Sequence, residues 1–170
     1  MTRWAALPRA INAGKPLKMA DLRAFLEAEG MRDVQTLLAS GNAVFDCDED
    51  AAAIEARLAA RARAVLSLDT DWFVRSHAEL AAIRAADPFP EATAVRPAKV
   101  HVLFFHATVA MPALVHDGPE RMQAIGRELF IDFIEGIGDS KLPAAMARAK
   151  LPPSTGRNWN TLVKLVAATA

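Results

Sequence analysis

Apolar residues in the first 76 positions form two kinds of pattern, short continuous runs and stripes at helical spacing. One stripe begins at Met19 and ends before Gly30, a residue suited to closing a helix, and a second covers residues 50–66. The short runs predict four strands, at residues 3–7, 34–39, 43–47 and 70–75. The order strand, helix, strand, strand, helix, strand is that of a split βαβ, or ferredoxin-like, unit.

Two polar motifs in this first part predict local structure. Ser40, Gly41 and Asn42 have the chemistry of a hairpin turn, although Ser40 and Asn42 are also placed to present binding side chains from a sheet end. Ser76 and Glu79 stand three positions apart, as in a capping box. They predict a short helix that ends before Pro88.

The second part follows a segment with three prolines and little periodicity, residues 87–97, which we interpret as a connector. Beyond it the pattern predicts a strand at 98–105, a short helix at 109–116 and two strands within 123–134. Ser140 and Lys141 open a further helix, and the last helix starts at about Asn158. The element order of the first part therefore begins again.

These patterns predict an α+β protein of two ferredoxin-like subdomains, with mainly antiparallel sheets and a C-terminal helix. The expected boundaries are residues 1–86 for the first subdomain, 87–97 for the connector and 98–170 for the second subdomain. The two parts share no residue-level similarity, so the duplication rests on element order. We expect them to form one compact unit.

Composition excludes several classes of protein. The 20 basic and 20 acidic residues cancel, which argues against a globally basic nucleic-acid binder, and 52% hydrophobic residues argue against disorder. The single Cys47 cannot form an internal disulfide, which favours a reducing compartment. Neither a secretory signal nor an uncharged run of about 18 residues is recognisable, so we expect a cytoplasmic protein without a membrane partner.

The neutral total conceals two basic ends. Residues 1–18 hold four basic residues and no acid, and residues 139–170 hold five basic residues and one acid, so each end carries +4 and the middle −8. If the ends meet in the fold, their arginines suit a phosphate or carboxylate. The alternative is that the charges coat separate solvated faces.

The sequence offers little catalytic chemistry. The segment from Gly136 to Lys141 lacks the Gly-Lys-Ser/Thr order of a nucleotide-binding P-loop, and no Gly-x-Ser-x-Gly elbow is present. The four histidines show no metal-ligand spacing, so each is read as structural or exposed. We therefore predict no cofactor, no metal site and no specific catalytic residue.

Four segments, in this order and at about these separations, carry a resemblance to a known family. They are residues 9–14 (RAINAG), 38–45 (LASGNAVF), 136–142 (GIGDSKL) and 157–161 (RNWNT). The chain resembles the bacterial domain of unknown function 1697 over essentially its whole length. The resemblance implies an α+β fold with two related subdomains and no established activity. The chain departs from the family's usual first loop at two positions. Pro8 removes a backbone N–H donor, and Ala10 disfavours a left-handed backbone conformation.

Three hypotheses for function remain open at this stage. The leading one is a binding module for an anionic ligand, such as a nucleotide, a phosphorylated metabolite or a nucleic-acid backbone, between the two halves. The second is a hydrolase or transferase in the same cleft, for which only Asp139 is offered as a nearby acid or base. The third is a structural or interaction protein, monomeric or homodimeric. The predicted ligand-binding residues are Arg9, Asn12, Ser40, Asn42, Ser140, Lys141, Arg157, Asn158 and Asn160.

Overall fold

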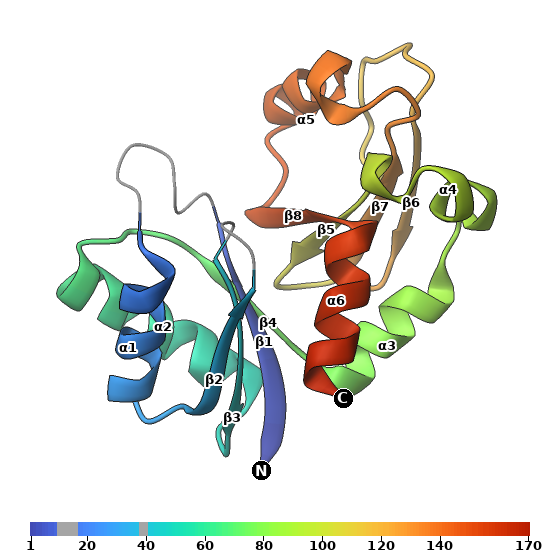
Figure 1. The fold of residues 1–170 in the computed structure, drawn as a ribbon. Coiled ribbons are helices and arrows are strands. Elements are labelled where there is room, and N and C mark those ends of the chain that lie inside the picture. Colours follow the sequence, from blue (N-terminus) through green and yellow to red (C-terminus); the bar gives the residue numbers. More distant parts are fainter. Residues whose placement is uncertain (10–16, 38–40) are drawn as a thin grey trace. The chain divides into compact units, whose positions relative to one another are not determined.

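The computed structural model describes residues 1–9, 17–37 and 41–170. The chain divides into two compact units, the first made of residues 1–82 and 165–170 and the second of residues 83–164 (Figure 1). The divisions fall inside α3 (His77–Ala86) and α6 (Trp159–Thr169), so each of these helices contributes residues to both units.

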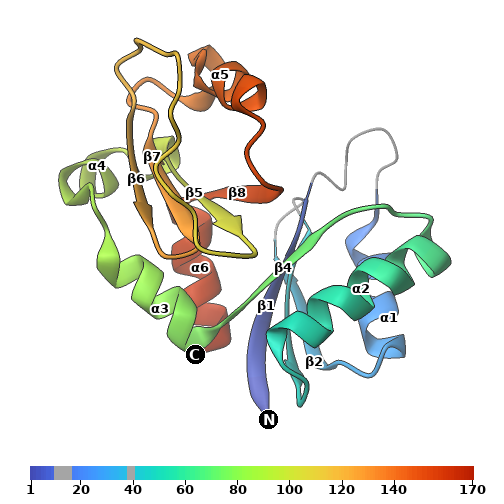
Figure 2. The same cartoon turned by 180° about the vertical axis from the view of Figure 1, so that it is seen from behind.

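The first unit has the predicted ferredoxin-like topology. Its sheet has the order β2-β3-β1-β4, and every neighbouring pair of strands is antiparallel. Figure 2 shows α1 and α2 on the same face of this sheet. The elements are β1 (Thr2–Pro8), α1 (Met19–Ala28), β2 (Arg32–Leu37), β3 (Asn42–Cys47), α2 (Ala51–Leu66) and β4 (Trp72–Ser76).

The core of the first unit follows from the two periodicities in the sequence. Alternate residues of the central strands, such as Ala6 and Phe45, face the helices, while Leu22 and Ile54 belong to the apolar stripes of α1 and α2. All four residues are fully buried. Ser76 and Glu79 form the predicted capping box, because each side chain accepts the other residue's backbone N–H, at 3.2 and 2.8 Å.

The second unit repeats this strand topology. Its sheet has the order β6-β7-β5-β8, again with antiparallel neighbours. The fold class predicted from the sequence is therefore confirmed. Its strands and its one long internal helix are β5 (Val100–Phe105), β6 (Arg121–Ile125), β7 (Glu128–Asp132), α5 (Leu142–Ala149) and β8 (Ser154–Asn158).

The predicted helix at residues 109–116 is wrong, because residues 106–120 between β5 and β6 are irregular. Pro112 disfavours helical backbone at Met111, and the Val109 N–H donates to the carbonyl of Gly126 at 2.9 Å instead of to a helical partner. Val109 and Leu114 still pack against the core of the unit. The second unit thus lacks the first helix of the ferredoxin-like pattern.

Four further elements were not predicted. The connector contains α4 (Pro90–Val95) and a 3-10 turn, η1 (Pro97–Lys99), each of which begins with a proline. A proline suits the first turn of a helix, where its missing N–H has no partner to lose. A second 3-10 turn, η2 (Ile137–Asp139), precedes α5, and β8 lies between α5 and α6.

Both faces of the second sheet carry apolar residues. Leu129, Ile131 and Phe105 pack with Leu142 of α5 on one face. On the other face, the ring centroid of Phe130 lies 6.4 Å from that of Trp159, a buried residue of α6. Among the helices that the structure describes, none has the length and apolar character needed to span a bilayer.

Candidate functional site

The predicted binding residues of the first unit have mainly structural contacts in the described part of the chain. The backbone N–H of Arg9 donates to Thr70 Oγ1 and to the carbonyl of Asp71, both at 3.1 Å, and Arg9 itself is exposed. Asn42 is fully buried, and its Nδ2 donates to the carbonyl of Leu37 at 3.0 Å, across the β2–β3 hairpin. Asn12 and Ser40 lie outside the described residues.

The residues predicted near the last helix also take part in local structure. Arg157 of β8 is buried and its Nη1 donates to Thr155 Oγ1 at 2.7 Å and to the carbonyl of Gly156 at 2.8 Å. Burial lowers the pKa of its guanidinium to about 10, so the group remains charged at neutral pH. Asn158 caps α6, because its Oδ1 accepts the Thr161 N–H at 3.0 Å, and Asn160 is exposed in the first turn.

Arg157 and α5 lie on opposite faces of the second sheet. Arg157 is paired with Val102 across the β5–β8 ladder, whereas the next residue of β5, Leu103, packs with the α5 cluster. Arg157 therefore faces away from the α5 side of the second sheet. The prediction that Arg9, Lys141 and Arg157 surround one ligand involves both units and stays a prediction.

Ser140 and Lys141 adjoin a polar pocket of about 280 Å³. Ser140 Oγ donates to Glu120 Oε1, and His116 Nε2 lies 2.7 Å from the other oxygen, Glu120 Oε2. The hydrogen bond from Ser140, followed by that from His116, holds the pKa of the Glu120 carboxyl below its usual value. The pocket is lined by His116, Asp117, Gly118, Pro119, Glu120, Asp139 and Lys141.

This polar cluster lacks the geometry of a nucleophile and its base. Ser140 and His116 bind different oxygens of one carboxylate, so the hydroxyl is not directed at the imidazole. His116 and Glu120 are nevertheless acid–base groups that sequence reasoning missed, because they lie in an irregular segment about 20 residues before Ser140. A hydrolase or transferase stays a prediction.

The polar pocket is also a poor site for an anion. Three carboxylates, those of Asp117, Glu120 and Asp139, line it beside Lys141 and His116. At the amino end of α5, Ser140 Oγ already accepts the Leu142 N–H at 3.0 Å, and Pro143 has no N–H. The cluster instead joins the irregular 106–120 segment to the start of α5.

Gly118 is required for this junction. A Cβ atom at residue 118 would overlap both the Glu120 carboxylate and the His116 ring. We therefore expect Gly118→Ala to lower the free energy of unfolding by about 1–3 kcal/mol, measured by urea denaturation. Gly138→Ala is the matched control, because a Cβ there meets no atom within 4 Å. Equal effects of the two substitutions would contradict a tight His116–Glu120 junction.

A second pocket, of about 410 Å³, lies between the second sheet and α5. We call it the apolar pocket. Strands β5, β7 and β8 contribute His101, Leu103, Ile131 and Gly156, and the chain before and within α5 contributes the opposite wall. Its lining residues are His101, Leu103, Ile131, Phe133, Ile137, Pro143, Met146 and Gly156.

The apolar pocket has a physical origin in the fold. Two helices cover one face of the first sheet, but α5 alone is the helix packed on the corresponding face of the second, because residues 106–120 are irregular. Gly156 of β8 also places no side chain on this face, where a Cβ would come within 2.8 Å of Leu103 Cδ2. Gly156 therefore contributes no side chain to the lining of the apolar pocket.

His101 is the single polar side chain in that lining. Burial lowers the pKa of its imidazole, and a hydrogen bond to the backbone of Ala98 opposes this shift only in part. Its ring packs edge-to-face on Phe133, with centroids 5.0 Å apart and planes at 85°. No group of side chains suited to a metal ion occurs among the described residues.

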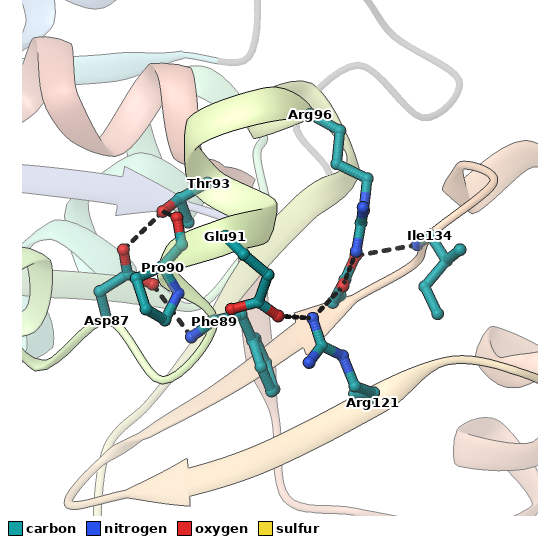
Figure 3. A network of polar contacts seen from close by, with 9 residues as sticks. Asp87, Phe89, Pro90, Glu91, Thr93, Arg96, Arg121 and Ile134 are labelled. Atoms are coloured by element: carbon teal, nitrogen blue, oxygen red, sulfur yellow. Dashed lines mark hydrogen bonds and ion pairs between the residues drawn. The ribbon is translucent and has the colours of Figure 1, made fainter.

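Asp132 has a structural role in a clamp whose other members, Arg96, Arg121 and Glu91, are labelled in Figure 3. Asp132 is fully buried and accepts two hydrogen bonds from Arg96, at 3.1 and 2.5 Å, and one from Arg121 at 2.7 Å. Arg121 also pairs with Glu91 at 2.5 Å and lies 4.6 Å above the Phe89 ring. This clamp joins α4 to the sheet.

The clamp also determines the backbone that leads to the apolar pocket. Asp132 Oδ1 accepts the Ile134 N–H at 3.0 Å, and Ile134 has φ +59°, a left-handed conformation that is rare for a β-branched residue. The chain then continues through the second 3-10 turn, which carries the lining residue Ile137. Asp132 is therefore part of the support of the pocket wall.

Two four-stranded antiparallel sheets, each in ferredoxin order, define an α+β protein with two ferredoxin-like halves. The chain belongs to the family described as "Protein of unknown function (DUF1697)", whose profile matches residues 1–130, so the resemblance noted in the sequence is confirmed. Among solved structures, the chain is similar to SP0830, a conserved bacterial protein from Streptococcus pneumoniae. The TM-score is 0.70 at 20% identity, over 99% of each chain, and this likeness shows the fold alone. No curated protein matches.

Proposed function

We propose that the protein is a binding module for a small, largely apolar organic molecule, which it holds in the apolar pocket of the second unit. The observation that carries the proposal is the apolar lining of this pocket of about 410 Å³. Of its eight lining residues, only His101 has a side chain that can be charged or form strong hydrogen bonds. Ligand pockets in proteins typically have volumes of about 300–1,000 Å³ and apolar linings with few polar groups.

The size and lining of the apolar pocket favour an aromatic ligand. A dry apolar cavity of about 150 Å³ is enough to bind benzene in other proteins, so one ring or two fused rings fit here. Met146 supplies a polarisable thioether and Phe133 an aromatic ring, both of which contact aromatic ligands favourably. A charged group would lose its hydration in this lining without gaining an ion pair.

Titration calorimetry of the full chain tests the proposal, with toluene and naphthalene as neutral probes and benzoate as an anionic one. We expect both neutral probes to bind at one site and benzoate to bind at least about tenfold more weakly, because its carboxylate must be desolvated. Failure of both neutral probes to bind, or tighter binding of benzoate than of toluene, would overturn the proposal.

A second candidate is the anionic ligand predicted from the two basic ends. It is supported by the +4 charge of residues 1–18 and of residues 139–170, and by the exposure of Arg9. In this candidate Arg9, Lys141 and Arg157 supply charge, and Asn12, Ser40, Asn42, Ser140, Asn158 and Asn160 orient the ligand. Titration with nucleotides, phosphorylated metabolites and short oligonucleotides tests it. Binding that survives both Arg9→Ala and Arg157→Ala unchanged would place the anion elsewhere.

A further inference from the structure

The chemistry of His101 narrows the ligand of the apolar pocket beyond its size. We infer that this ligand is an aromatic molecule with one hydrogen-bond donor, a phenol O–H or an indole N–H, which it donates to a ring nitrogen of His101. The inference rests on the proposed function, because it concerns the ligand of the same pocket.

The protonation state of the His101 imidazole determines which groups it can bind. A charged imidazolium is disfavoured by burial, which holds the pKa of His101 below its usual value, so the ring is neutral at pH 7. A neutral imidazole has one nitrogen that donates and one that accepts. The hydrogen bond to the Ala98 backbone favours the protonated form, as expected when the ring donates to a carbonyl. The second nitrogen is then an acceptor.

The His101 ring is held in position by its neighbours. The edge-to-face contact with Phe133, with ring centroids 5.0 Å apart, restricts the orientation of the His101 ring. His101 lines the apolar pocket together with Leu103 and Ile131 of the same sheet face. An acceptor held in place before the ligand arrives loses little entropy on binding.

A ligand that fills the apolar pocket changes the surroundings of His101. A wholly apolar ligand separates the His101 acceptor from solvent and offers it no donor in return. An acceptor left unsatisfied in this way opposes binding, whereas a phenol or indole restores the hydrogen bond. The other seven lining residues offer only weak acceptors or none from their side chains. The donor therefore has one preferred partner.

The test compares p-cresol with toluene, which has the same ring and methyl group without the hydroxyl. Titration calorimetry of the full chain at pH 7.5 is expected to show about fivefold tighter binding of p-cresol, the effect of one neutral hydrogen bond. In His101→Leu this preference is expected to disappear, while toluene continues to bind and so reports a folded pocket. His106→Leu, at an exposed histidine outside the lining, is the matched control and should retain the preference.

The outcomes separate the two proposals. Equal affinities for p-cresol and toluene in the wild-type chain, or a preference that persists in His101→Leu, would overturn the inference and leave the apolar pocket as the binding site. Absence of binding by both probes in the wild-type chain would instead overturn the proposed function itself. A fivefold preference that is lost only in His101→Leu supports both.

Discussion

Asp132→Asn is expected to lower the free energy of unfolding by about 3 kcal/mol, because removing the carboxylate leaves two arginines paired with a neutral amide in a buried position. The side chains of Arg96 and Arg121 are 28% and 42% exposed, so water recovers part of the loss and the effect stays at the lower end of the range for buried ion pairs. Urea denaturation measures it. Glu91→Gln is the control: its side chain is 59% exposed, and we expect a loss below about 1 kcal/mol.

The same clamp predicts a dependence of stability on pH. Burial raises the pKa of Asp132, but the hydrogen bonds from Arg96, Arg121 and the Ile134 N–H outweigh it and lower the pKa to about 2. Because the folded-state pKa lies below the unfolded value of about 3.9, the contribution is fully present above that value and is lost as the pH falls through about 2. Its size is about 2–3 kcal/mol. Between pH 5 and pH 2 the wild-type chain should therefore lose more stability than Asp132→Asn, and parallel profiles would contradict this.

Gly156→Val is expected to weaken the binding of toluene by about tenfold or more, because the new side chain would occupy the apolar pocket and displace Leu103. Valine is favoured in strands, so β8 should accept it and the chain should remain folded. Titration calorimetry measures the affinity, and thermal unfolding measures the stability.

The matched control for Gly156→Val is Gly138→Val. A Cβ at Gly138 has no atom within 4 Å, and Gly138 is not part of the lining, so the same added side chain should leave the affinity for toluene unchanged. Unchanged affinity in Gly156→Val, with the chain still folded, would show that toluene binds outside the apolar pocket.

The first unit could be predicted because its signals are local. Each signal is visible within a few residues of sequence: the short apolar runs of the strands, the helical stripes that contain Leu22 and Ile54, and the cap at Ser76. β8 could not be predicted in the same way. Its residues, Ser154 to Asn158, include no apolar run, and they form a strand because Thr155 and Arg157 pair with the free edge of β5.

The candidate site was missed for a related reason. The apolar pocket depends on how α5 packs on the second sheet and on the position of Gly156 opposite Leu103, neither of which is visible in a local pattern. His101 was one of four histidines that no spacing distinguished. Its sequence signal is weak: it is the one polar residue in β5, whose other residues are apolar on both faces.

Methyl-detected NMR of the full chain during a toluene titration tests the central claim most directly, since it locates the ligand as well as detecting it. We expect saturable shifts, and contacts between the toluene protons and the side-chain methyl groups of Leu103, Ile131 and Met146, with little change at Leu22 or Ile54 in the other unit. Saturable shifts centred on the first unit, or no shifts at all at toluene's solubility limit, would contradict a ligand site beneath α5.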